Sequence, residues 1–155
     1  MTVFIIKYCM FYIFVFLSWT LCLYWLHRII HITPVLRKIH WEHHKYINTH
    51  KTGWHWNNLF LFNDNWVSTL DLWITEVIPT LIFSYITGQW WVIIFYYFWA
   101  ALIQEIIEHN PNVNWYPILT SGKWHLVHHR NNKVNFGLFL PVWDILFRTR
   151  SKLNF

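Results

Sequence analysis

Charged residues are scarce in this chain of 155 residues: they make up 12% of it, against 55% hydrophobic and 22% aromatic residues. Because a soluble domain usually carries about 25% charged residues, this composition argues against an ordinary soluble fold. The 13 Trp and 8 Tyr residues are typical of a protein with much surface at a membrane–water boundary. The net charge of +5 comes from basic residues that flank apolar runs, so we expect contacts to anionic lipid headgroups and no nucleic-acid partner.

Cysteine and glycine are also rare, with two and four residues. Cys9 and Cys22 both lie in the first apolar run, so we expect no disulfide framework, and neither is paired with a histidine at zinc-finger spacing. The glycine patterns of P-loops, Rossmann folds and nucleophile elbows are missing from the sequence, and so is the HExxH motif of zinc proteases. The sequence therefore gives no support to nucleotide chemistry or hydrolysis.

The first apolar run, residues 3–26, predicts a membrane-spanning helix. At about 1.5 Å per residue, such a helix is long enough for a hydrocarbon core of about 30 Å. A cleaved signal peptide is the alternative interpretation, but the run is too long and lacks a small-residue cleavage site before His27. Residues 66–87 and 90–107 predict two further spans, joined as a helical hairpin by a short polar turn at Gly88.

Polar residues refine these expectations. Asp71 and Glu76 lie early in the second apolar segment, so we expect the span proper to begin near Trp73. Pro34 is expected to break or restart a helix, which predicts a new, histidine-rich helix over residues 35–46.

The basic residues predict how the protein lies in the membrane. Of the 12 Lys and Arg residues, all but Lys7 fall in segments 27–65 and 108–155. Since cytoplasmic loops are enriched in Lys and Arg, we expect both segments to face the cytosol. The expected fold is an all-α integral membrane protein in one domain, residues 1–155. It is a transmembrane helical bundle of one N-terminal span and a hairpin, with a cytosolic histidine-rich metal-binding cap, in the endoplasmic reticulum of a eukaryote or the inner membrane of a bacterium.

Eight histidines stand in three clusters at helical spacing. His27 and His31 are four apart, and the pattern His-x-x-His-His occurs twice, beginning at His40 and at His125. Residues three and four apart share one face of a helix, so each cluster can direct two or three imidazoles at one point. Scattered interfacial histidines are the alternative, which the repeated spacing disfavours. Imidazole ligands suit iron, zinc, copper or nickel.

The end of the last apolar segment extends this pattern. Glu105 and His109 are four apart and share a helical face, and carboxylates near hydrocarbon are costly and usually functional. Glu108 points about 100° away, so we expect it behind the ligands or on the surface. With His109 the clustered histidines are too many for one ion of about four ligands, and two metals is the economical count. His50 and His55 fall outside the clusters and are expected to be interfacial or to support the ligands.

The order of these clusters resembles a known superfamily. The last cluster runs into Asn135-Phe-Gly137 and then Trp143-Asp144-Ile-Leu-Phe147-Arg-Thr149. From His27 to Thr149 the chain is similar to the fatty acid hydroxylase and sterol desaturase superfamily of membrane di-iron oxidoreductases. Histidine clusters alone are shared with acyl desaturases and alkane hydroxylases, whereas the two closing motifs favour the hydroxylase branch.

The resemblance implies a function and a cofactor. Members of the superfamily bind two iron ions with the clustered histidines and use O2 to attack an unactivated C–H bond of a lipid. This chain is accordingly expected to hydroxylate or desaturate a fatty acyl, sterol or related alkyl chain in lipid biosynthesis, with electrons from an external carrier and reductase. By position, the resemblance assigns the metal ligands to nine residues: His27, His31, His40, His43, His44, His109, His125, His128 and His129.

Two residues depart from the family pattern. Glu105, which we expect to be catalytic, stands where some members have a histidine, and it either binds a metal or orients an imidazole. Arg148 stands where a glycine is common. The chain is short for the family, so we expect the substrate-binding region to be reduced or supplied by a partner. The alternative from another class is a non-catalytic histidine-rich metal-binding protein or a metal transporter, although transport favours ionisable residues near the middle of the spans.

Overall fold

The computed structural model describes residues 2–47, 53–63 and 65–152. The described part of the chain is helical, and an isolated antiparallel bridge pairs Asn114 with Gly122. The short helix η1 is a 3-10 helix, whereas η2 and η3 are π-helical segments within longer helices. In chain order the elements are α1 (Thr2–Ile32), α2 (Pro34–Ile47), η1 (Trp56–Phe60), α3 (Trp66–Leu72), η2 (Trp73–Val77), α4 (Ile78–Thr87), α5 (Trp91–Trp99), η3 (Ala100–Gln104), α6 (Glu105–Ile107), α7 (Lys123–Arg130) and α8 (Val142–Leu146).

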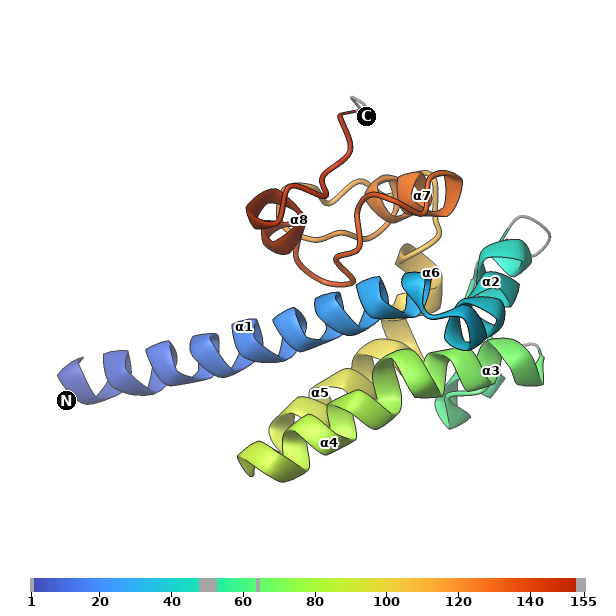
Figure 1. Ribbon diagram of the computed structural model, residues 1–155. Helices are drawn as coiled ribbons and strands as arrows, with labels where there is room; N and C mark the ends of the chain where they lie inside the picture. Colours follow the sequence, from blue (N-terminus) through green and yellow to red (C-terminus); the bar gives the residue numbers. More distant parts are fainter. Residues whose placement is uncertain (1, 48–52, 64, 153–155) are drawn as a thin grey trace.

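Helix α1 is the longest element, and it carries the first two histidines. It continues to Ile32, beyond the expected end of the span at residue 26. Helix α2 begins at Pro34, as the sequence predicted, because a proline at the first helical position forgoes only an N–H that would have no helical partner. The side chains of residues 4–14 are all exposed, and burial begins at Val15. In Figure 1 this exposed end of α1 projects beyond the other helices.

Helices α4 and α5 form the expected hairpin (Figure 1). Gly88 ends α4 with a φ of 68°, in the left-handed region that favours glycine. The helix that leads into the hairpin begins at Trp66, earlier than the start expected near Trp73. Asp71 and Glu76 are both buried within this helix, so they do not mark the start of the apolar segment but face the interior of the protein.

Among the described residues, two helices are long and apolar enough to cross a membrane: Phe4–Ile32, with 29 residues, and Trp66–Thr87, with 22 residues. Only 28% of the most apolar window of the first helix is buried inside the protein. The third apolar helix, Trp91–Ile107, is shorter, and at 1.5 Å per residue it measures roughly 25 Å against a hydrocarbon core of about 30 Å. So much exposed apolar helical surface suggests a membrane protein.

The core joins α1 to the hairpin and to the C-terminal segment. Trp19 of α1 is fully buried, and its Nε1 donates a hydrogen bond of 3.0 Å to Oγ1 of Thr80 in α4. The ring of Phe139 lies 4.8 Å from the Trp19 ring between centroids. Trp143 of α8 donates from Nε1 to Oγ1 of Thr20 at 3.1 Å. These contacts hold the C-terminal segment, which contains α7 and α8, along the second half of α1 (Figure 1).

Candidate metal centre

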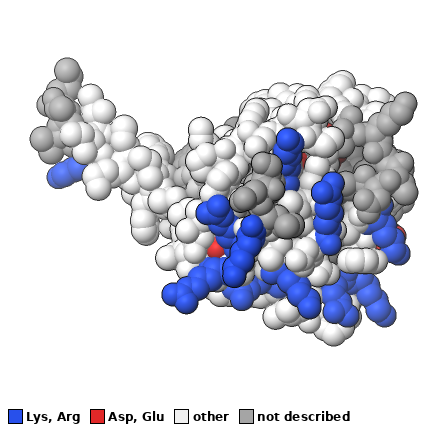
Figure 2. Space-filling model, turned by 90° about the horizontal axis from the view of Figure 1, so that it is seen from above, with Lys and Arg blue, Asp and Glu red and all other residues white. Residues whose placement is uncertain are grey.

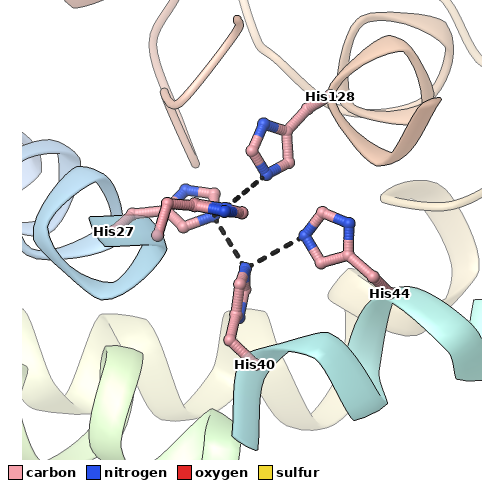
Figure 3. A group of neighbouring side chains, drawn as sticks. His27, His40, His44 and His128 are labelled. Carbon is pink, nitrogen blue, oxygen red and sulfur yellow. Dashed lines mark hydrogen bonds between the residues drawn. The ribbon is translucent and has the colours of Figure 1, made fainter. Parts of the chain in front are cut away.

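Five imidazoles from α1, α2 and α7 meet at one point; Figure 3 labels four of them. The Nε2 atoms of His27 and His40 are 3.1 Å apart, and those of His31 and His128 are 3.0 Å apart. The Nε2 atoms of His40 and His44 are also 3.1 Å apart. Two nitrogens that bind one metal ion at about 2.1 Å, at right angles to each other, lie about 3 Å apart. The spacing of the five imidazoles therefore matches the ligand shell of a single ion.

Two carbonyl oxygens determine which ring nitrogen faces this point. Nδ1 of His27 donates to the carbonyl oxygen of Phe136 at 2.8 Å, and Nδ1 of His128 donates to that of Val134 at 2.7 Å. A carbonyl oxygen only accepts hydrogen bonds, so in both neutral rings the proton is on Nδ1. The Nε2 atoms of His27 and His128 consequently present lone pairs to the centre.

Asp71 has the same effect on His40. Both of its carboxylate oxygens lie 3.0 Å from Nδ1 of His40, so Nε2 of His40 also presents a lone pair. The lone pairs of His27 and His40 thus face each other across 3.1 Å, which is repulsive unless a cation lies between them. The donor set therefore fits a metal ion.

Four more imidazoles form a second group, whose possible ligand atoms all lie within 4.8 Å of one another: His43, His109, His125 and His129. Nε2 of His125 is 2.9 Å from Nε2 of His129. Nε2 of His109 is buried and has no hydrogen-bond partner among the described residues. Such an orphaned polar atom costs about 1–3 kcal/mol, and a bond to a metal would offset that cost. The two groups are adjacent, with the rings of His44 and His129 only 4.2 Å apart between centroids.

A cavity of about 20 Å³ borders both groups. His27 and His40 of the first group and His43 and His125 of the second line it. One water molecule needs roughly 10–15 Å³, so the cavity has room for a molecule of one or two heavy atoms. Four carboxylate side chains complete the polar wall: Asp71, Glu76, Glu105 and Glu108.

Burial sets the charge of the groups around this cavity. Burial lowers the pKa of four imidazoles that lie outside the candidate membrane spans, and neighbouring imidazoles lower it further. These four are His40, His109, His125 and His128. These rings are therefore neutral, which is the form that binds metals. Burial, reinforced by the nearby Glu76, raises the pKa of Glu108. The raised pKa favours the neutral acid. Since the described residues that line the cavity include neither Lys nor Arg, a metal cation is the charge that would hold this group as a carboxylate.

The two C-terminal motifs build the hydrogen-bond acceptor for His27. Oδ1 of Asp144 accepts from the backbone N–H of Phe136 at 2.7 Å, and Oδ2 accepts from that of Gly137 at 2.9 Å. Oγ1 of Thr149 also donates to Asp144, at 2.7 Å. A Cβ at Gly137 would lie 2.9 Å from Oδ2 of Asp144, closer than real contacts allow. The motifs therefore hold the Phe136 carbonyl group in place to receive Nδ1 of His27.

The structure brings together all nine histidines that the sequence singled out, five in one group and four in the other. His55 is exposed and belongs to neither group, whereas His50 lies outside the described residues. Glu105 is half-buried and lines the cavity.

Of the two positions expected for Glu108, behind the ligands or on the surface, the structure contradicts the second. Its side chain is buried, and its Oε1 lies 3.6 Å from Nε2 of His125, so it is not a surface group. Glu108 keeps helical backbone angles, with φ −64° and ψ −42°, and its N–H bonds to the Gln104 carbonyl oxygen at 2.8 Å. The π-helical segment η3 precedes it and departs from 3.6 residues per turn, so regular helical spacing does not give the direction of this side chain.

Asp71 is the residue that sequence reasoning missed. We interpreted it only as a sign of where a span begins, because its partner His40 is 31 positions away in the chain. The signal that could have identified it is the one that identified Glu105: a carboxylate in an apolar segment is costly and usually functional.

Replacing Asp71 by Asn should weaken metal binding by about 10–100-fold, the usual cost of losing a group that orients a ligand imidazole. The amide no longer fixes the proton on Nδ1 of His40 and makes the ring a poorer donor. The measurement is the iron affinity of the purified variant. Glu42→Gln is the matched control, because Glu42 is a solvent-exposed carboxylate on α2 paired with Lys45. Equal affinities in the two variants would show that Asp71 does not orient His40.

Comparison with known proteins places the chain in a family. The model of the family "Fatty acid hydroxylase" matches residues 12–149. The Delta(7)-sterol 5(6)-desaturase of Leptosphaeria maculans is 30% identical over 141 residues, which cover 90% of this chain and 36% of that protein. The corresponding desaturase of Aspergillus fumigatus is 27% identical over 134 residues, covering 86% of this chain and 35% of that protein.

The chain thus spans about a third of the length of these curated relatives. No solved structure matches it. The family match nevertheless extends from the middle of α1 to the end of the closing Trp-Asp motif, and it includes every histidine of the two groups. The chain belongs to the fatty acid hydroxylase family, within the superfamily that includes the sterol desaturases.

Proposed function

We propose that this chain, as one membrane domain over residues 1–155, uses O2 and two iron ions to hydroxylate or desaturate a lipid. The observation that carries the proposal is the pair of adjacent imidazole groups that both border one small, carboxylate-lined cavity. Family membership supports a lipid substrate. The printed names of the relatives, which are sterol desaturases, favour a sterol or a related alkyl chain over a polar substrate.

Iron bound in the two groups would supply the redox chemistry that protein side chains lack. Five histidines would hold one ion: His27, His31, His40, His44 and His128. Four would hold the other: His43, His109, His125 and His129. Glu105, at the wall of the cavity, would act beside them either as a donor atom or by orienting an imidazole.

The protein's own contribution is geometry and the exclusion of water. Asp71 and the carbonyl groups of Phe136 and Val134 keep three imidazoles in the tautomer that binds metal. Leu72 and Leu138 line the same cavity as the carboxylates. A cavity of about 20 Å³ admits a molecule as small as O2 and leaves little space for bulk water, which protects a reactive oxidant from side reactions.

Electrons would come from an external carrier and its reductase. The sequence carries no glycine-rich motif for binding a flavin or a nicotinamide. We infer the electron carrier, its reductase and the lipid substrate from the chemistry of the family.

We place the histidine groups at the cytosolic face of the membrane, in the endoplasmic reticulum or the bacterial inner membrane. Lys and Arg side chains gather on the body of the molecule (Figure 2), whereas the exposed end of α1 carries Lys7 alone. This distribution supports the placement because cytosolic segments are enriched in basic residues. In a background without Cys9 and Cys22, a cysteine at Asn132 should react with a cytosolic reagent and one at Thr87 should not. Labelling of both from the same side would contradict this orientation.

The proposed function is tested by comparing lipid extracts of cells with and without the protein by mass spectrometry. A lipid that gains one oxygen identifies a hydroxylase, and a lipid that loses two hydrogens identifies a desaturase. Either change should disappear in cells that express His40→Ala, which removes a proposed ligand. If the lipids stay the same when the protein is present together with an electron donor, the proposed function is wrong.

A further inference from the structure

The side chain of Glu108 lies next to the second imidazole group, which its position in the sequence does not indicate. Its two carboxylate oxygens have different neighbours. Oε2 accepts a hydrogen bond of 2.8 Å from Nε2 of Gln104, whereas Oε1 lies 3.6 Å from Nε2 of His125. The same Nε2 of His125 is 2.9 Å from Nε2 of His129, so it is the nitrogen that faces the other ligands of the group.

The distance of 3.6 Å is too long for a good hydrogen bond. It is, however, the separation expected of two donor atoms that bind one metal ion at about 2.1 Å with an angle near 120° between them. Burial strengthens this interpretation, because the Glu108 side chain is only 8% exposed and that of His125 only 3% exposed. A carboxylate held in such a place without a cation would lose its hydration and gain little in return.

The neighbours of Glu108 hold its carboxylate in one orientation. Nε2 of Gln104 donates to Glu108 and also approaches Oε1 of Glu76 at 3.2 Å. Gln104 belongs to the π-helical segment η3 and Glu76 to η2, so each arm of the hairpin contributes a polar residue from a π-helical turn. The backbone of Glu108 is fixed as well, because its carbonyl oxygen accepts from the N–H of Gly122 at 2.9 Å. With Oε2 held by Gln104, Oε1 remains directed at the imidazole group.

We infer that Glu108, through Oε1, is a fifth donor to the ion held by the second imidazole group. This inference rests on the proposed function, because it requires a metal in that group. It would give both ions five protein donors and place an anionic oxygen ligand on one of them only. The two ions would then be chemically different, since a carboxylate is a harder ligand than an imidazole and favours the higher oxidation state of iron.

The test compares Glu108→Gln with Glu42→Gln in the purified full chain, reconstituted with ferrous iron without oxygen. Both variants replace a carboxylate by an amide of equal size, but Glu42 is paired with Lys45 on α2 and does not line the cavity. The measurements are the number of irons per chain, their affinities and the Mössbauer spectrum. Glu108→Gln should weaken one of two iron sites by more than the roughly 10–100-fold typical of a group that only orients a ligand, and should change one of two spectral components. Glu42→Gln should change neither the count nor that component.

A second variant keeps the inference testable if Glu108→Gln does not fold. Glu108→His replaces the carboxylate by another metal donor without restoring the anionic acceptor for Gln104, so recovery of the second iron would support a donor role. Two irons of unchanged affinity in Glu108→Gln would overturn the inference while leaving the proposed function intact, and so would loss of the second iron in Glu108→His. A wild-type chain that binds no iron would instead contradict the proposed function itself.

Discussion

Replacing His128 by alanine is expected to abolish iron binding in the first imidazole group and to reduce lipid oxidation to background. The His128 side chain is fully buried, and its Nε2 lies 3.0 Å from that of His31. Its Nδ1 is held by the Val134 carbonyl oxygen, which fixes the ring with Nε2 toward the other imidazoles. Loss of this donor also leaves an unfilled space and unpaired lone pairs around it. Iron content and product yield, measured on the same membrane preparation, give the result.

His55→Ala is the matched control, because His55 is exposed and lies outside both groups. It should retain the iron content and most of the activity of the unchanged protein. If the two alanine variants had equal iron and equal product, the spacing of the clustered histidines would have no functional meaning.

Gly122→Ala should have the largest effect on folding. Gly122 has a φ of 77° and a ψ of −129°, and a Cβ there would overlap the carbonyl group of Val113. The N–H of Gly122 bonds to the Glu108 carbonyl oxygen, and that of Lys123 bonds to the Val113 carbonyl oxygen, both at 2.9 Å. To relieve the overlap, the start of α7 would have to move away from Val113. This movement would break the hydrogen bond to Glu108 and separate α7 from the turn that carries Glu108. Backbone strain and overpacking together should cost about 3 kcal/mol or more.

Thermal unfolding in detergent and iron content measure this effect. Gly88→Ala separates strain from overlap, because Gly88 also has a positive φ, of 68°, but a Cβ there meets nothing within 4 Å. It should cost only about 1 kcal/mol and leave iron binding unchanged. Equal destabilisation by the two variants would mean that the contact with Val113 does not position α7.

The spacing of the histidines was sufficient to predict that they converge, because side chains three and four apart share a helical face. It could not predict how they divide. His43 and His44 are neighbours in α2, as are His128 and His129 in α7, yet the members of each pair belong to different groups. Adjacent residues point about 100° apart on a helix. Which direction each takes therefore depends on how α1, α2 and α7 pack.

The carboxylates were harder to predict for the same reason. Asp71 and His40 meet only because α3 packs against α2, and Glu108 follows a π-helical segment that changes the direction of the side chains after it. The hairpin, by contrast, followed from local features: two apolar runs, a short polar turn and one glycine. Local signals thus predicted the helices and the kinds of ligand, whereas packing determined which atoms face the cavity.

The most direct test of the central claim is metal analysis of the purified chain after expression in iron-replete cells. Two groups of five and four imidazoles can each hold one ion, so we expect about two irons per chain. The His128→Ala variant should then contain about one iron or less, and His55→Ala about two. A single tightly bound zinc with no iron, in a preparation that still folds and inserts in the membrane, would contradict the account.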